Sequence, residues 1–146
     1  MPGIIVGVDG SGHSQRALDW AMHEAAIRHL PLTILTVHPA IAGYFGGIVT
    51  SPQDEELTEQ VRVAVTAEAE KVLADLDGPH PESVTVRATH SFPVEELINA
   101  SKEADLVVLG SRGKGGFTRL MLGSTADQVV RHAHCPVTIV PPEDRN

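Results

Sequence analysis

Residues 105–125 read Asp105-Leu106-Val107-Val108-Leu109-Gly110-Ser111-Arg112-Gly113-Lys114-Gly115-Gly116-Phe117-Thr118-Arg119-Leu120-Met121-Leu122-Gly123-Ser124-Thr125, an apolar run that leads directly into a glycine-rich stretch. The run 105–109 is short, contains β-branched residues and is bounded by turn residues, which is typical of a buried parallel strand. The residues that follow, 126–133, have the apolar spacing of a helix. The sequence therefore predicts a strand, a glycine-rich loop and a helix, in this order.

The loop and the helix start together have the features of a phosphate-binding site. Four of its first seven residues, 110–116, are glycines, so the backbone can adopt positive φ and its N–H groups can approach a ligand closely. Gly123-Ser124-Thr125 stands at the predicted helix start, where unpaired N–H groups and the helix dipole attract anions. The composition alone leaves open a surface loop followed by an ordinary helix cap.

Several named motifs are absent. The loop has no G-x-x-x-x-G-K-[ST] motif, because Gly116 follows Gly115, and it has no strict G-x-G-x-x-G. The turn Gly10-Ser11-Gly12 lacks the third glycine of a dinucleotide fingerprint, and His38, not an acidic residue, ends the second predicted strand. Leu122 and Ala126 occupy the glycine positions of a nucleophile elbow around Ser124, which argues against acyl transfer.

Length and composition favour one globular domain, residues 1–146. Hydrophobic residues make up 42% of the 146 residues and aromatic residues only 3%, so we expect a core of aliphatic side chains, as in a parallel sheet covered by helices. The formal net charge of −8 argues against nucleic-acid or anionic-membrane binding. The glycine-rich loop is locally basic in this acidic chain, because it contains Arg112, Lys114 and Arg119.

The sequence favours a cytoplasmic protein. Cys135 is the only cysteine, so an intramolecular disulfide is impossible. Met1-Pro2-Gly3 leads directly into a predicted strand and not into a signal peptide. No apolar run approaches the roughly 18 residues of a membrane span.

The remaining pattern alternates strands and helices. Strands are predicted at 4–8, 32–37, 84–89, 106–109 and 137–140. The first predicted helix has its N-cap at Ser14 and extends to about His29, and the second extends from Asp54 to about Leu76. A third helix begins at Pro93, and the fourth covers 126–133. We expect the buried face of the second helix to contain Leu57, Val61, Ala64, Val65, Val72, Leu73 and Leu76. This order is that of an open, parallel, doubly wound α/β sheet, whose ligands bind at the carboxyl ends of the strands.

Two further features remain without an assigned role. Pro39 to Pro52 is a long loop that contains Tyr44, and it could be a lid, a partner contact or a mobile segment. The eight histidines are scattered over the chain, so no metal site is predicted.

The spacing G-x2-G-x9-G-[ST] formed by Gly110, Gly113 and Gly123-Ser124 resembles the nucleotide loop of the universal stress protein family. The resemblance continues in 6–11, 32–38 and 135–140. It implies a five-stranded sheet of the adenine nucleotide alpha hydrolase-like type, with strand order 3-2-1-4-5. In that order the first and fourth strands are neighbours, so Asp9 and the glycine-rich loop face one crevice.

The resemblance also implies a ligand, which is ATP or another adenine nucleotide, with Mg²⁺. The binding residues that it implies lie at the strand ends and in the loop: Val8, Asp9, Val37, Leu109, Gly110, Arg112, Gly113, Gly123, Ser124 and Thr125. Asp9 would lie beside the ribose or contact the nucleotide-bound metal, and Val37 would offer backbone groups to adenine.

The resulting expectation is a nucleotide-binding protein with a regulatory or stress-response role. Turnover is not expected, because no residue is a candidate general base for attack on the γ-phosphate and the S-G-G-x-D-S motif of related ATP pyrophosphatases is absent after Val8. The alternatives are a slow ATPase or self-phosphorylating protein, and a family member that binds no nucleotide and acts through protein contacts. An uncharged edge strand at 137–140 predicts a homodimer.

Overall fold

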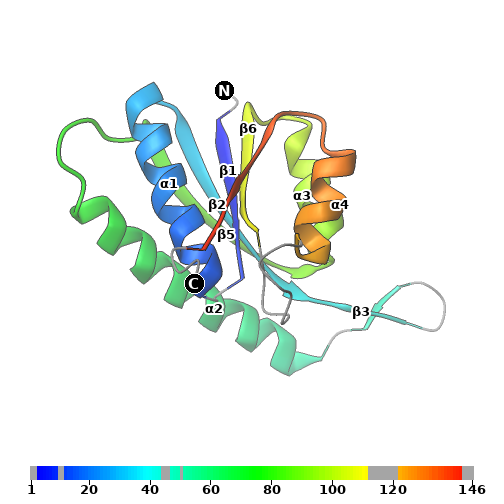
Figure 1. Ribbon diagram of the computed structural model, residues 1–146. Coiled ribbons are helices and arrows are strands. Elements are labelled where there is room, and N and C mark those ends of the chain that lie inside the picture. The colour runs from blue at the N-terminus through cyan, green and yellow to red at the C-terminus, as the bar shows by residue number, and fades with distance from the viewer. Residues whose placement is uncertain (1–2, 10–11, 44–46, 50, 112–121, 143–146) are drawn as a thin grey trace.

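The computed structural model describes residues 3–9, 12–43, 47–49, 51–111 and 122–142 (Figure 1). The described chain alternates strands with helices, as the sequence predicts. Its elements are β1 (Ile4–Val8), α1 (Gly12–Arg28), β2 (Pro31–Pro39), β3 (Ile41–Ala42), β4 (Ile48–Val49), α2 (Pro52–Ala74), β5 (Ser83–Ser91), α3 (Pro93–Ser101), β6 (Leu106–Gly110), α4 (Ser124–His132) and β7 (Val137–Val140).

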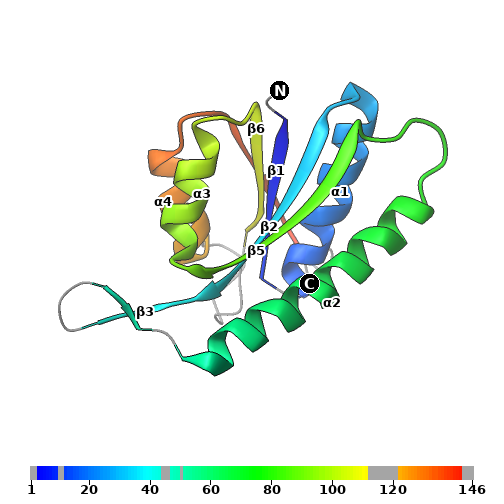
Figure 2. The same cartoon turned by 180° about the vertical axis from the view of Figure 1, so that it is seen from behind.

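Five of the strands form one parallel sheet in the order β5-β2-β1-β6-β7. This is the order 3-2-1-4-5 that the family resemblance implies, so the predicted fold class is confirmed. β1 lies at the centre, with Ile4 opposite Leu32 of β2 and Leu106 of β6. Figures 1 and 2 show α1 and α2 on one face of the sheet and α3 and α4 on the other.

The two faces of the sheet bury separate aliphatic clusters. On the face of α1 and α2, the strand residues Ile4 and Val6 pack against the α1 residues Ala17, Leu18, Ala21, Met22 and Ala25. The alanines of α1 allow the helix to lie close to the strands. On the other face, Leu97 and Val129 from α3 and α4 cover Val107 and Leu109 of β6.

Gly7 allows this second face to pack closely. A Cβ at this position would lie 2.8 Å from Leu109 Cδ2 and 3.1 Å from Leu97 Cδ2. The absence of a side chain at the middle of β1 therefore lets these two leucines meet over the strand. Leu109 is one of the predicted site residues, so this contact anchors the end of β6.

The predicted buried face of α2 is partly wrong. Val65 and Leu76 are buried and Val61, Val72 and Leu73 are partly buried, but Leu57 is 44% exposed and Ala64 is also exposed. The buried Ala69 was not predicted. The first turns of α2 lie beside the β3–β4 hairpin and the carboxyl ends of β2 and β5 (Figures 1 and 2), beyond most of the sheet face that the later turns of the helix cover.

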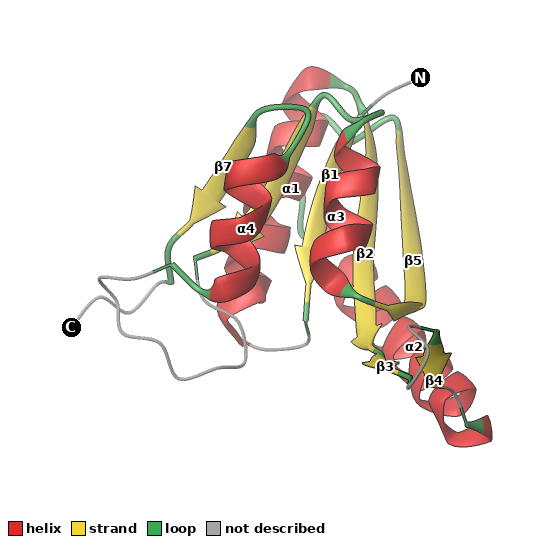
Figure 3. Cartoon of the chain, turned by 90° about the vertical axis from the view of Figure 1, so that its right-hand side faces the viewer, coloured by secondary structure: helices red, strands yellow, loops and turns green. Residues whose placement is uncertain are grey.

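Two other predictions need correction. Ser14 is not an N-cap, because α1 already begins at Gly12 and Ser14 is buried in its first turn. Part of the predicted loop 39–52 is regular structure: β2 continues to Pro39, and Ile41 pairs with Val49 in the antiparallel β3–β4 hairpin. This hairpin projects from the sheet beside the start of α2 (Figure 3).

Candidate functional site

Three neighbouring strands end at the same edge of the sheet. β1 ends at Val8, which lies opposite Thr36 of β2. The residues that follow this pair are Asp9, just after β1, and Val37 of β2. Val6 lies opposite Val108, so Gly110, the last residue of β6, is two residues further along. Because parallel strands share one carboxyl edge, the structure brings these predicted site residues together.

Burial separates the roles that these residues can have. Val8 and Leu109 are buried, and their side chains belong to the clusters on opposite faces of the sheet. Only their backbone groups can therefore take part in a site at the edge. Asp9, Val37 and Gly110 are half-buried. The Asp9 N–H donates to Ser14 Oγ at 3.3 Å, which connects the end of β1 to the first turn of α1.

The start of α4 is held against the end of β6. The Gly123 N–H donates to the Ser111 carbonyl oxygen at 2.8 Å, and the Ser111 N–H donates to the Val140 carbonyl oxygen at 3.1 Å. Gly123 is the N-cap residue, with Ser124 exposed and Thr125 half-buried behind it. The first N–H groups of a helix have no acceptor within the helix, so this arrangement presents donors and a positive dipole end beside the strand ends.

Two predicted site residues, Arg112 and Gly113, lie outside the described residues, as do Lys114 and Arg119. The structure therefore brings together Val8, Asp9, Val37, Leu109, Gly110, Gly123, Ser124 and Thr125. The geometry of these residues fits an anionic ligand that is bound mainly by backbone donors.

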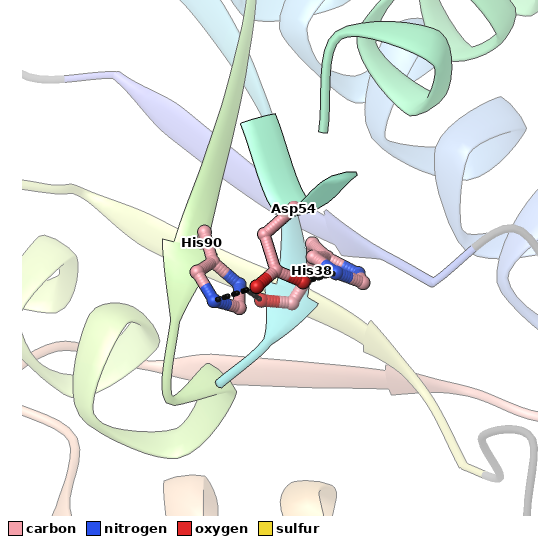
Figure 4. Close-up of side chains that lie close together, drawn as sticks. All are labelled: His38, Asp54 and His90. Atoms are coloured by element: carbon pink, nitrogen blue, oxygen red, sulfur yellow. Dashed lines mark hydrogen bonds and ion pairs between the residues drawn. The ribbon is translucent and has the colours of Figure 1, made fainter. Parts of the chain in front are cut away.

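A second cluster, formed by His38, Asp54 and His90, was missed by sequence reasoning (Figure 4). His38 Nε2 lies 3.1 Å from Asp54 Oδ1, and His90 Nε2 lies 3.6 Å from Asp54 Oδ2. The hydrogen bond with His38 lowers the pKa of the Asp54 carboxyl. The available signal was that both histidines directly follow predicted strands, 32–37 and 84–89, which become neighbours in the implied strand order.

An open parallel sheet with a helix start held at its carboxyl edge defines a doubly wound α/β protein with a ligand site at that edge. Residues 2–141 match the Universal stress protein family. The chain belongs to the universal stress protein family, so the family resemblance is confirmed.

Curated relatives agree with this assignment. A universal stress protein of Mycolicibacterium smegmatis is 35% identical over 145 residues, which cover 98% of this chain and 49% of the relative. The chain thus spans about half the length of the curated relatives it matches.

Solved structures of the family have the same fold. Universal stress protein UspA from Lactobacillus plantarum is similar with a TM-score of 0.77 and 25% identity, over 95% of this chain and 97% of that one. A universal stress protein in complex with cAMP is similar with a TM-score of 0.67 and 25% identity, over 97% and 98% of the two chains. None of the helices in the described part of this chain is long and apolar enough to cross a bilayer.

Proposed function

We propose that this chain is an adenine-nucleotide-binding protein of the cytoplasm, with ATP and Mg²⁺ as its ligand and a regulatory or stress-response role. The observation that carries the proposal is the hydrogen bond from Gly123 to Ser111, which holds the start of α4 at the carboxyl edge where β1, β2 and β6 end. The structural relative in complex with cAMP supports an adenine nucleotide as the ligand class. We further propose that residues 1–146 are one domain.

Each part of the site has a role in this proposal. Backbone donors from Gly110, Gly113 and the start of α4 bind the phosphates, because unpaired N–H groups favour anions. The hydroxyls of Ser124 and Thr125 add donors, and Arg112 adds a cation from the loop. Asp9 contacts the ribose or the Mg²⁺ that the phosphates bring.

A contact with adenine and two buried side chains complete the proposed site. The backbone of Val37 contacts adenine at the end of β2. Val8 and Leu109 keep their side chains in the core, so they position the strand ends and not the ligand directly. A site built from backbone groups on rigid strands requires little rearrangement on binding, which favours affinity.

We propose binding without appreciable turnover. In the sequence no group is a candidate general base for the attacking water, and the loop lacks a Walker-type lysine. Slow hydrolysis or self-phosphorylation is the alternative. A steady-state ATPase rate on the order of 1 s⁻¹ that a site substitution abolishes would favour this alternative.

The experiment that tests the proposal is calorimetry of ATP with Mg²⁺ on the purified chain and on its Gly113→Ala variant. A Cβ at a position of close backbone approach should weaken binding at least roughly tenfold, about 1.4 kcal/mol. Gly47→Ala is the matched control, because a Cβ there has no atom within 4 Å and the backbone is not in the left-handed region.

The expected result is unchanged affinity for Gly47→Ala and the tenfold loss for Gly113→Ala. Equal affinity of wild type and a folded Gly113→Ala protein would refute this use of the loop. Absence of binding by wild type to ATP, AMP and cAMP would refute the proposed function and favour a family member that acts through protein contacts.

A second part of the proposal is a homodimer through β7. β7 is an edge of the sheet and pairs with β6 on one side, so its other side can accept a strand of a second copy.

A further inference from the structure

His38, Asp54 and His90 come from three different elements of the fold. His38 and His90 lie directly opposite each other in the register of β2 and β5, near the carboxyl ends of both strands. Asp54 lies in the first turn of α2 and reaches back toward both rings (Figure 4). The two rings stack with centroids 4.8 Å apart and an interplanar angle of 28°. Strand pairing and the start of α2 therefore build one cluster.

The hydrogen bond of His90 Nδ1 determines which nitrogen carries the proton. Nδ1 lies 3.1 Å from the His38 carbonyl oxygen, which can only accept, so Nδ1–H is the donor. In the neutral ring, Nε2 then has a lone pair. Metal-binding histidines have this same arrangement, in which one nitrogen donates to a carbonyl and the other is free to coordinate.

The lone pair of His90 Nε2 faces a carboxylate. This atom is buried and has no hydrogen-bond partner among the described residues. Its neighbour, Asp54 Oδ2 at 3.6 Å, is itself an acceptor. Two electron-pair donors thus face each other in a site where the His90 side chain is only 14% exposed. A cation between them would satisfy both.

Asp54 is held in position for this role. Its Oδ2 accepts the Ser51 N–H at 2.9 Å, as part of the capping interaction at the start of α2, and Ser51 Oγ donates to the same oxygen at 3.2 Å. Its Oδ1 lies 3.1 Å from His38 Nε2. Because the backbone of α2 fixes the carboxylate, binding of an ion would require little ordering of this side chain.

The distances fit one small ion. The ligand atoms of the three residues all lie within 4.8 Å of one another. Zinc bonds of about 2.0–2.2 Å to nitrogen and oxygen place tetrahedral ligands about 3.4 Å apart. Asp54 Oδ1 lies 3.1 Å from His38 Nε2 and Asp54 Oδ2 lies 3.6 Å from His90 Nε2, on either side of this value. Small movements of the side chains would bring one carboxylate oxygen and both nitrogens to a single ion.

We propose that His38, Asp54 and His90 form a binding site for a divalent transition metal of the zinc type, with both Nε2 atoms and the Asp54 carboxylate as ligands. The ion would replace the hydrogen bond that the His38 Nε2–H donates to Asp54 Oδ1, and that proton would move to Nδ1 or leave to solvent. Two imidazoles favour zinc, copper or nickel over magnesium and calcium, which prefer oxygen ligands only. Three protein ligands leave the fourth tetrahedral position for water or a partner group. In the described residues, this is the one group of three or more histidine, cysteine or acidic side chains with such spacing.

The proposed ion would join three points of the chain. His38 precedes the β3–β4 hairpin and Asp54 follows it, while His90 lies on the edge strand β5. Metal binding would therefore join the ends of β2 and β5 to the first turn of α2. The stabilisation of folded protein by ligand binding predicts a higher melting temperature in the presence of zinc.

The test is zinc binding by the purified chain, after removal of metal with a chelator and in the absence of nucleotide. Calorimetry should show one zinc per wild-type chain. His90→Ala and Asp54→Asn should each weaken binding at least tenfold, because loss of a direct ligand costs at least as much as loss of a second-shell partner. The Asn variant keeps the shape of the side chain and removes its charge.

The control is the double variant His132→Gln/His134→Gln, which removes two histidines outside the cluster that are exposed near the end of α4. It should bind zinc as wild type does. Cobalt as a spectroscopic probe should give the visible absorption of a four-coordinate ion in wild type and in the control, and lose it in Asp54→Asn. Circular dichroism verifies that each variant is folded.

Three results would overturn the proposal. The first is no zinc binding by wild type, which would leave an imidazolium–carboxylate ion pair as the explanation of the cluster. The second is zinc affinity unchanged in folded Asp54→Asn and His90→Ala proteins. The third is loss of binding in the His132→Gln/His134→Gln control. Since no nucleotide is present, none of these results bears on the proposed nucleotide site, and failure of nucleotide binding leaves the metal test unaffected.

Discussion

Cys135 shows how burial controls the chemistry of a single side chain. It precedes β7, is half-buried and packs against the cluster on the face of α3 and α4. Burial raises the pKa of its thiol, and its S–H donates to the Pro136 carbonyl oxygen at 3.4 Å. Both effects favour the thiol over the reactive thiolate. The cysteine is therefore a packing residue and not a candidate nucleophile.

We predict slow alkylation of Cys135 in the folded protein. At about pH 8, iodoacetamide should react several-fold more slowly with the native chain than with the chain in urea, because only the thiolate reacts. The rate for the native protein should continue to rise at pH values where that of the unfolded chain levels off. Mass spectrometry of the labelled protein measures both rates, and equal rates would show that burial does not control this thiol.

Ser101 connects two elements on the same side of the sheet. It is buried at the end of α3, where its Oγ donates to the Ile98 carbonyl oxygen at 2.6 Å and accepts the His134 N–H at 2.9 Å. The hydroxyl thus joins α3 to the segment between α4 and β7. This contact holds the far end of α4, whose start belongs to the proposed nucleotide site.

Ser101→Ala should lower the free energy of unfolding by about 0.5–1.5 kcal/mol, because it removes the partly buried hydrogen bond that the His134 N–H donates to this hydroxyl. Ser83→Ala, at the exposed start of β5, is the control and should change the stability little. Urea denaturation monitored by circular dichroism measures both. Equal stability of Ser101→Ala and wild type would mean that water replaces the hydroxyl at no cost.

For the whole molecule, β7 is the element through which we propose that two copies pair. Val137 and Ile139 pack on the face of α3 and α4, and Val140 packs on the face of α1 and α2, so both faces of the strand are occupied within the chain. Arg16 of α1 donates to the carbonyl oxygens of Pro141 and Pro142 at 2.8 and 3.1 Å, which holds the end of the strand. Only the outer edge of β7 is then available to a second copy.

The wild-type chain should therefore be a dimer in light scattering at micromolar concentration, and Ile139→Pro should convert it to a monomer. The Pro136 and Val140 carbonyl oxygens accept hydrogen bonds from the side of β6, so the residues between them in alternation, Val137 and Ile139, turn their N–H groups to the outer edge. Proline at 139 removes one of these outer donors, and the prolines at both ends limit the pairing to about four residues. A two-fold contact of this length favours a closed dimer over a fibre. A monomeric wild type, or a dimer that survives Ile139→Pro in a folded protein, would contradict the prediction.

At this scale, much of the fold could be predicted from local patterns. The runs that became β1 and β6 are apolar and short, and glycine or proline bounds most elements, so their type and order followed from the sequence. The order of strands in the sheet did not follow from periodicity. It came from the resemblance in the glycine-rich loop, and the structure confirms it.

The residues of the proposed nucleotide site could be selected from the sequence for a similar reason. Asp9 directly follows the apolar strand β1, and Gly110 ends the apolar strand β6. A parallel sheet must bring such positions to one edge. The β3–β4 hairpin was not predicted, because two-residue strands are too short to show an alternating pattern. The exposure of Leu57 was also missed, since helical spacing does not reveal how far a helix extends beyond the sheet.

The sequence by itself determined the strands, the helices and the carboxyl edge at which a ligand would bind, because each depends on neighbours a few residues apart. Only the tertiary structure decided that His38, Asp54 and His90 meet. Their contact depends on the pairing of β2 with β5 and on the position of α2, which span more than fifty residues of chain. Contacts of that range arise from the packing of whole elements, which no local pattern of residues records.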